Sequence, residues 1–191
     1  MEGKLIIVSA PSGAGKTTIV KQLLERGLPL EFSISACSRS KRENEINGKD
    51  YYFLSVEDFK QKIENDEFVE WEEVYEGSYY GTLKTEIERI WQKGKHVLFD
   101  VDVQGGVNIK NKYKDKSLSV FIKPPCINEL EKRLRGRGSE TEESIKKRVA
   151  KANYEMTFMN KFDKIIVNEI LEKAVDEIFA CVIEFLNHEK A

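Results

Sequence analysis

The segment "APSGAGKT", residues 10–17, follows the apolar run "LIIV" and restricts the fold more than any other stretch of the chain. It matches the P-loop pattern G-x-x-x-x-G-K-[ST] except at its first position, where Ala10 replaces glycine. A glycine-rich turn between a strand and a helix directs several backbone N–H groups at one small volume, and the helix dipole adds positive potential there. The pattern therefore predicts a phosphate-binding loop rather than a plain strand-to-helix turn.

The side chains of this loop suit a nucleotide. Gly13 and Gly15 let the backbone approach a phosphate closely, and Lys16 reaches the β and γ oxygens as a point charge. The Thr17 hydroxyl can bind Mg²⁺. The apolar run before the loop and the amphipathic stretch after it supply the strand and helix that a P-loop requires.

The order of apolar runs and helical stretches predicts an α/β fold with a helix layer on each side of a parallel sheet. The expected strands are "KLIIVS", "FSIS", "HVLFDVD", "LSVFIK" and "KIIVNE". The expected helices are "TTIVKQLLERG", "LKTEIERIWQKG", "INELEKRLRGRG", "EESIKKRVAKANYEM" and "LEKAVDEIFACVIEFLNHEK". Residues 35–82 break this alternation with "KDYYFLS", a short helix "VEDFKQKIEN" and the alternating "EFVEWEEVYEG". They predict a small inserted lobe with antiparallel strands.

Length and charge exclude several classes of protein. The chain has 191 residues, enough for one domain with a substantial core, and a formal net charge of −2, which argues against a general nucleic-acid binder. No stretch approaches the roughly 20 apolar residues of a membrane span, and no secretory signal is evident, so we expect a cytoplasmic protein without a membrane partner. Cys37, Cys126 and Cys181 are far apart in sequence, which predicts neither a zinc site nor disulfides.

Two carboxylates, Asp100 and Asp102, end the expected strand "HVLFDVD" and would point to the same face of it. Ligands of open α/β sheets bind outside the carboxyl ends of the strands. We therefore expect Asp100 to contribute to a Mg²⁺ site together with Thr17, because Mg²⁺ prefers oxygen donors and keeps much of its water. A surface pair at a strand end is the alternative.

Several segments in series resemble the guanylate kinase family over nearly the whole chain. They are "SAPSGAGKTT", "SISACSRSKRENE", "GKDYYFLSVEDF", "FVEWEEVYEGSYYGT", "LFDVDVQGG", "RLRGRGSETEESIKKR" and "FDKIIVNE". The resemblance implies a P-loop core of residues 1–34, 83–125 and 151–191, a GMP-binding lobe of residues 35–82 and a mobile lid of residues 126–150. It also implies ATP binding by the loop and one residue beyond it: Ala10, Pro11, Ser12, Gly13, Ala14, Gly15, Lys16, Thr17, Thr18 and Asn168.

The GMP site implied by the resemblance lies mostly in the lobe. Arginine and tyrosine side chains there match the family's phosphate ligands, and guanidinium forks suit a phosphate dianion because they bond it twice. Glu70 matches the residue that accepts from the N1–H and N2–H₂ groups of guanine, a donor pair that adenine lacks. The full implied set is Ser35, Arg39, Arg42, Tyr51, Glu70, Tyr80, Thr82 and Asp102.

The basic cluster "RLRGRG" matches the family's lid, whose cations close over the transferring phosphoryl group. The resemblance implies a catalytic set of Lys16, Arg39, Arg133, Arg137 and Arg148. A solvated basic helix is the alternative interpretation of Arg133, Arg137 and Arg148. For Asn168 the alternative is a turn residue at a strand end.

The expected activity is Mg²⁺-dependent phosphoryl transfer from ATP, as co-substrate, to GMP, giving ADP and GDP, by a monomer or a homodimer. Two alternatives remain: a guanylate-kinase-like module that binds protein ligands without activity, and a kinase for another nucleoside monophosphate. Modules of the first kind typically lack the P-loop, whereas Lys16 and Thr17 are present here. Glu70 with Thr82 is the feature that favours guanine.

Overall fold

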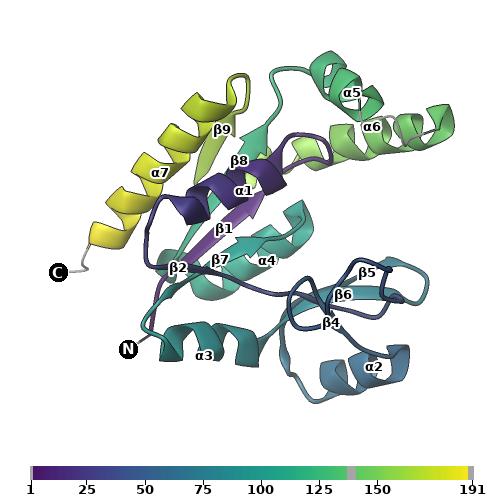
Figure 1. Cartoon of the computed structure of the whole chain (residues 1–191), viewed down its shortest axis with the longest axis vertical. Coiled ribbons are helices and arrows are strands. Elements are labelled where there is room, and N and C mark those ends of the chain that lie inside the picture. The colour runs from purple at the N-terminus through teal and green to yellow at the C-terminus, as the bar shows by residue number, and fades with distance from the viewer. Residues whose placement is uncertain (1, 137–140, 189–191) are drawn as a thin grey trace.

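The computed structural model describes residues 2–136 and 141–188 and contains two β-sheets (Figure 1). The larger sheet has five strands in the order β2-β7-β1-β8-β9, and every neighbouring pair is parallel. Its strands are β1 Leu5–Ser9, β2 Leu30–Phe32, β7 His96–Asp100, β8 Ser117–Lys123 and β9 Lys164–Val167. All five residues of β1 are buried, as expected for the central strand of a sheet covered on both faces.

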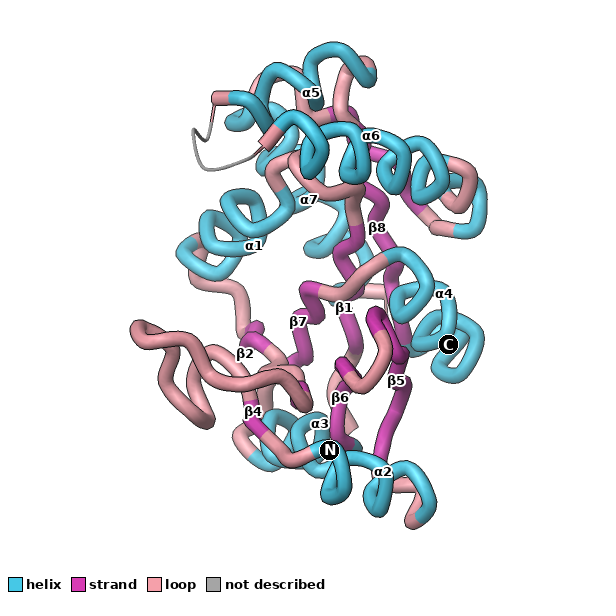
Figure 2. The backbone as a smooth tube through the Cα atoms, turned by 90° about the vertical axis from the view of Figure 1, so that its right-hand side faces the viewer, coloured by secondary structure: helices cyan, strands magenta, loops and turns pink. Residues whose placement is uncertain are grey.

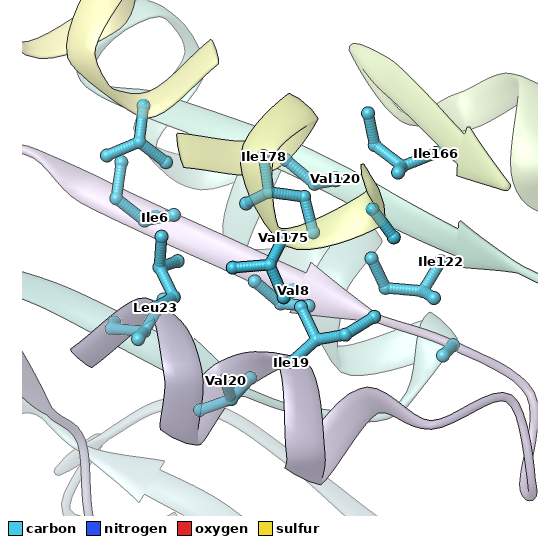
Figure 3. Packing of buried hydrophobic residues seen from close by; sticks show 14 of the residues in the cluster. Ile6, Val8, Ile19, Val20, Leu23, Val120, Ile122, Ile166, Val175 and Ile178 are labelled. Atoms are coloured by element: carbon cyan, nitrogen blue, oxygen red, sulfur yellow. The ribbon is translucent and has the colours of Figure 1, made fainter. Parts of the chain in front are cut away.

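Helices cover both faces of this sheet. On one face, α1 Lys16–Glu25 and α7 Leu171–Asn187 bury their apolar sides against it. Figure 3 shows Ile19 of α1 and Val175 of α7 packed over Val8 of β1. On the other face lie α3 Lys84–Gln92 and α4 Val103–Tyr113, which pack on the opposite sides of β1 and β7. The three-layer α/β arrangement expected from the sequence is confirmed.

The second sheet has four strands in the order β4-β3-β6-β5 and belongs to the inserted segment. They are β3 Ala36–Cys37, β4 Tyr52–Phe53, β5 Phe68–Tyr75 and β6 Ser78–Leu83. Helix α2 Val56–Glu64 is capped by Ser55, whose hydroxyl accepts from the Asp58 N–H, and it buries Phe59 in a stack on Phe68. The pairing of β5 with β6 is antiparallel, as the alternating pattern predicted.

Two further helices, α5 Ile127–Arg135 and α6 Glu142–Met156, pack against each other through Leu130, Leu134 and Ala152. They lie at the opposite end of the molecule from α2 and α3 (Figures 1 and 2). Two short 3₁₀ helices, at Lys114–Lys116 and Met159–Lys161, complete the elements. Among the described residues, none of the helices combines the length and apolarity needed to cross a bilayer.

Three sequence-based expectations about the elements are wrong. The edge strand is Leu30–Phe32 and residues 33–35 of "FSIS" form no strand, because the chain is passing there from one sheet to the other. The strand "HVLFDVD" stops at Asp100, and Asp102 instead caps α4 by accepting from the Gly105 N–H at 2.7 Å.

The third difference is α4 itself, which was not predicted. Gly105 and Gly106 lower the intrinsic helix propensity of this segment and interrupt its pattern of apolar residues at helical spacing. Their presence has a packing reason: a Cβ on Gly106 would lie 2.5 Å from the Ser9 hydroxyl oxygen, and one on Gly105 would lie 2.9 Å from Oε2 of Glu70. Glycine therefore lets α4 approach both β1 and the second sheet.

Candidate functional site

A cavity of about 500 Å³ lies where the P-loop, the end of β7, the second sheet and α6 meet. Segments far apart in sequence thus share one space. Its lining residues are Ala10, Pro11, Ser12, Gly13, Gly15, Lys16, Thr17, Thr18, Phe32, Ser35, Asp50, Tyr51, Glu70, Glu72, Val74, Tyr80, Gly81, Asp100, Val101, Asp102, Lys151 and Glu155.

The P-loop connects β1 to α1 in a conformation that requires glycine. Gly13 and Gly15 both have φ of 93°, in the left-handed region that other residues rarely adopt. Asn168 supports the loop through a hydrogen bond. The residue is 5% exposed, and its side-chain Nδ2 donates to the Ala14 carbonyl oxygen at 2.7 Å. A Cβ on Gly15 would lie 2.4 Å from that Nδ2 atom, so the loop and Asn168 fit together only with glycine at this position.

Lys16 lies at the start of α1 and turns toward the end of β7. Its Nζ forms an ion pair with Asp100 and donates to the Val101 carbonyl oxygen at 2.8 Å. Thr17 and Asp100 both line the cavity, so two oxygen donors are available to a hard cation beside the lysine. Among the described residues, no group of three or more His, Cys, Asp or Glu side chains could hold a metal ion. Proteins commonly bind Mg²⁺ through one or two side-chain oxygens while substrate phosphates and water supply the rest, and Thr17 and Asp100 offer two such groups.

Helix α6 contacts the P-loop from the far side of the cavity. Arg148 donates from Nη1 to the Ser12 hydroxyl oxygen at 3.1 Å, and the Ser12 backbone N–H donates to Oε2 of Glu155 at 3.3 Å. Glu155 is only 4% exposed, and burial raises the pKa of its carboxyl. Sequence reasoning missed both Glu155 and Lys151. Helical spacing could have indicated Glu155, because it lies on the same side of α6 as the apolar residues Ile145 and Ala152. Among the described residues, it is the only acid buried on that helix.

Three carboxylates gather where β5 meets the start of α4. Glu70 and Glu72 are two apart on β5 and therefore point to the same face of the strand. Oε1 of Glu70 accepts from the Thr82 hydroxyl at 2.9 Å, and burial raises the pKa of Glu70 to about 7. A hydrogen bond to Asp102, together with burial, raises the pKa of Glu72 to about 8. The sequence analysis identified Glu70 and Asp102 but not Glu72, whose position is explicable only once β5 and α4 are placed side by side.

Arg39 lies in the loop after β3 with its guanidinium bonded to both oxygens of Glu45, at 2.6 and 2.7 Å. Its guanidinium carbon lies 5.1 Å from the centroid of the Tyr51 ring, and Tyr51 in turn meets Tyr80 edge to face at 6.1 Å. The Arg39 guanidinium and the Arg42 backbone N–H hold the pKa of Glu45 at about 2, well below its usual range. An arginine fork and two phenol rings thus form one cluster beside the cavity.

The structure brings most of the predicted site residues to the cavity wall, but not all. Thr82 and Asn168 are buried behind it, bonded to Glu70 and to Ala14 respectively. Arg42 is exposed; its backbone N–H donates to Oε2 of Glu45 at 2.9 Å, and its carbonyl oxygen accepts from the Glu45 backbone N–H at 3.1 Å. Other predicted residues outside the lining are Ala14, Arg39, Arg133 and Arg148.

Two of the three predicted lid arginines are described by the structure: Arg133 lies on α5 and Arg148 on α6. Arg133 donates from Nη2 to the Asn168 carbonyl oxygen at 3.1 Å and pairs with Glu129 at 3.3 Å. Arg148 contributes to a second hollow of about 400 Å³ at the start of α6. Arg137 lies outside the described residues. Helix α6 is capped by Thr141, whose hydroxyl accepts from the Ser144 N–H at 3.2 Å.

Comparison with known proteins agrees with this geometry. The family model described as guanylate kinase matches residues 2–185. The guanylate kinase of Bacteroides thetaiotaomicron is 54% identical over 99% of this chain and 93% of its own length, and that of Porphyromonas gingivalis is 52% identical over 96% and 98%. A crystal structure of guanylate kinase from Anaplasma phagocytophilum, 30% identical, superposes with a TM-score of 0.78 over 97% of this chain and 87% of that one. The chain belongs to the guanylate kinase family.

Proposed function

We propose that this chain transfers the γ-phosphoryl group of ATP to GMP and that the two ends of the cavity divide the work between the two nucleotides. Membership of the guanylate kinase family supports ATP as donor and GMP as acceptor, and the comparisons give no support to an inactive interaction module or to another acceptor. The observation that carries the proposal is that a P-loop with its lysine and the Glu70 carboxylate line one and the same cavity.

The P-loop end is the ATP site. Gly13 and Gly15 free the backbone N–H groups to face phosphate, and Lys16 reaches the β and γ oxygens once its Nζ leaves Asp100. Asn168 holds the loop in this shape through the Ala14 carbonyl. The remaining ATP contacts that we propose are those of the loop itself: Ala10, Pro11, Ser12, Thr17 and Thr18.

Thr17 and Asp100 would hold Mg²⁺, because both present oxygen donors to the cavity next to Lys16. When bound there, the ion would neutralise charge on the β and γ phosphate oxygens. The protein's own contribution is to hold these two oxygens at the end of β7 and the start of α1, two elements that a rigid sheet fixes relative to each other.

The opposite end is the GMP site. Glu70 accepts from the N1–H and N2–H₂ groups of guanine, while the Thr82 hydroxyl holds the carboxylate in place at 2.9 Å. Asp102 borders the base, and Ser35 lines the same wall. The GMP phosphate binds the cluster of Arg39, Arg42, Tyr51 and Tyr80. There it replaces Glu45 as the partner of the Arg39 guanidinium.

The transfer itself is an in-line displacement. An oxygen of the GMP phosphate attacks the γ phosphorus, and the bond from that phosphorus to the β–γ bridging oxygen breaks. The acceptor oxygen is already anionic, so no strong general base is required. Arg133, Arg137 and Arg148 supply the cations that close over the moving group as a lid of residues 126–150. The lobe of residues 35–82 carries GMP, and the core of residues 1–34, 83–125 and 151–191 carries ATP.

A coupled assay of ADP release tests the proposal directly. The purified chain with ATP and Mg²⁺ is given GMP, AMP, UMP or dTMP in turn. We expect turnover with GMP at least one hundred times that with the others, because a carboxylate placed for two donors leaves buried groups unpaired with the wrong base, at a cost of about 3 kcal/mol or more. Equal turnover with GMP and AMP would overturn the assignment of Glu70, and no turnover with any acceptor would overturn the activity.

A further inference from the structure

The chain crosses between its two sheets at two places, and one buried carboxylate just after the return crossing accepts a hydrogen bond from the outgoing crossing. It leaves the larger sheet after Phe32 of β2 and returns from β6 directly into α3. Glu86, in the first turn of α3, is 2% exposed. Its Oε1 accepts from the Ile34 backbone N–H at 2.9 Å, on the outgoing crossing. Glu86 is not part of the cavity lining and takes no part in the proposed chemistry.

The same carboxylate also reaches into the second sheet. Oε2 of Glu86 accepts from the Tyr52 hydroxyl on β4 at 2.9 Å, and Arg89, one turn further along α3, bonds both oxygens at 2.9 and 2.7 Å. Arg89 also pairs with Glu31 on β2. In Figure 2, α3 lies beside β4 and β6 at the base of the second sheet. The two oxygens of Glu86 therefore accept four hydrogen bonds that join α3, the crossing and the lobe.

Ile34 and Tyr52, which bond Glu86 from the outgoing crossing and from the lobe, are each the chain neighbour of a proposed GMP ligand. Ile34 precedes Ser35, and Tyr52 follows Tyr51; both neighbours line the cavity. The Tyr52 N–H also donates to the Ser35 carbonyl oxygen at 2.9 Å. Tyr51 and Tyr52 point to opposite sides of the strand, so the ring of one faces the cavity while the hydroxyl of the other is bonded to α3.

We infer that Glu86 is a positioning residue for GMP: through Tyr52 and Ile34 it holds Ser35 and Tyr51 at a set distance from the P-loop core. The inference rests on the GMP site proposed above. A pocket wall that is already ordered spares GMP the free energy of ordering it, which is a preorganisation effect on affinity. The ATP site lies on the core side of the crossing and has no contact with Glu86 among the bonds described, so ATP affinity does not depend on this clamp.

The test is Tyr52→Phe, which keeps the ring and removes only the hydroxyl that bridges lobe and core. We expect KM for GMP to rise about tenfold, with kcat and KM for ATP within twofold of wild type. A factor of ten corresponds to about 1.4 kcal/mol, the lower part of the range for a hydrogen bond to a charged group. Glu86→Ala removes the whole clamp and should raise KM for GMP further. Tyr52→Phe decides the matter if Glu86→Ala does not fold.

Tyr79→Phe is the matched control, because Tyr79 is a buried lobe tyrosine that stacks on Phe59. Its hydroxyl bonds Glu73, which also belongs to the lobe. It should lose comparable thermal stability and leave KM for GMP unchanged. The inference is overturned if Tyr52→Phe leaves KM for GMP within twofold, if Tyr79→Phe raises it equally, or if KM for ATP rises in step. A wild-type chain that fails to phosphorylate GMP would instead overturn the proposed function, so the two failures are distinguishable.

Discussion

Replacing Glu70 by glutamine should separate two effects of its carboxylate, one on activity toward GMP and the other on the stability of the fold. Burial raises the pKa of Glu70 from 4.5 to about 7. The folded chain therefore holds a proton on this group over a pH range in which the unfolded chain releases it. A raised acid pKa means that stability falls as pH rises from about 4.5 to about 7 and stays lower above that range. Glutamine does not ionise, so the stability of the variant lacks this dependence on pH.

The size of the effect follows from the pKa difference. A shift from 4.5 to about 7, at about 1.4 kcal/mol per pH unit, sets an upper limit of about 3.5 kcal/mol on what Glu70→Gln gains at pH 8. For a domain of this size that is a rise in Tm of at most roughly 7 to 14 °C. At pH 5 the same variant should gain less than about 1 kcal/mol, because wild-type Glu70 is then largely protonated. Glutamine also keeps an oxygen for the Thr82 hydroxyl.

Activity should move in the opposite direction. A glutamine side chain offers one acceptor to the two donors of guanine, and losing a bidentate base contact costs about 1 to 3 kcal/mol, or roughly five- to 150-fold in kcat/KM for GMP. Inosine monophosphate, which lacks the N2 amino group, is the comparison substrate: wild type should prefer GMP over it strongly and Glu70→Gln much less.

Two assays are needed, thermal melting of the free protein at pH 8 and pH 5, and initial rates with GMP and inosine monophosphate. A variant that melts at the wild-type temperature at pH 8 would refute the reasoning from burial. An unchanged preference for GMP would remove Glu70 from the base site, whatever its effect on stability.

The other predictions concern the two phosphate-binding regions. Lys16→Ala should abolish turnover and leave the calorimetric Kd for GMP within about threefold, because its Nζ contacts only Asp100 and Val101 among the described residues; an equal loss of GMP binding would contradict separate sites. Arg39→Lys should raise KM for GMP about tenfold and leave KM for ATP unchanged in steady-state assays, since an ammonium group cannot reproduce the fork now bonded to Glu45. Gly15→Ala should destroy ATP binding in a fluorescent-nucleotide titration, because its Cβ would lie 2.4 Å from the Asn168 amide nitrogen at φ of 93°; a variant with normal ATP affinity would show that the loop adapts.

Local patterns in the sequence were sufficient for most of the fold. The run Leu5–Ser9 is apolar at nearly every position and is followed by a glycine-rich loop and an amphipathic stretch, so the strand, the loop and α1 were predictable together. Helix α6 was predicted with its observed bounds, Glu142–Met156, because its polar and apolar positions alternate with helical period. Helix α4 escaped because Gly105 and Gly106 serve contacts with β1 and β5 that no local pattern reveals.

In the candidate site, too, some residues were predictable from a local motif and others were not. Its P-loop residues are consecutive in sequence and carry a recognisable motif, whereas Glu72, Glu86 and Glu155 are each one acid among 33 in the chain. What distinguishes them is the partner that the fold supplies: Asp102 for Glu72, Tyr52 for Glu86, and the Ser12 N–H for Glu155. Such pairs join distant segments, so sequence spacing alone could not identify them. The roles assigned to the site residues, the cytoplasmic location and the oligomeric state stay predictions.

The ion pair between Lys16 and Asp100 gives each of these two side chains a counter-charge at the P-loop end of the cavity. If Lys16 moves to the phosphates of ATP, Asp100 is left as an uncompensated carboxylate in a partly enclosed site, which is unfavourable. If a divalent cation reaches Asp100 first, Lys16 loses its own counter-charge. Only the joint arrival of phosphates and cation gives each of the two side chains a new partner. Under the proposed roles, ATP and Mg²⁺ therefore bind with positive coupling. Lys16 and Asp100 each replace one oppositely charged partner by another, so neither is left as an unpaired charge.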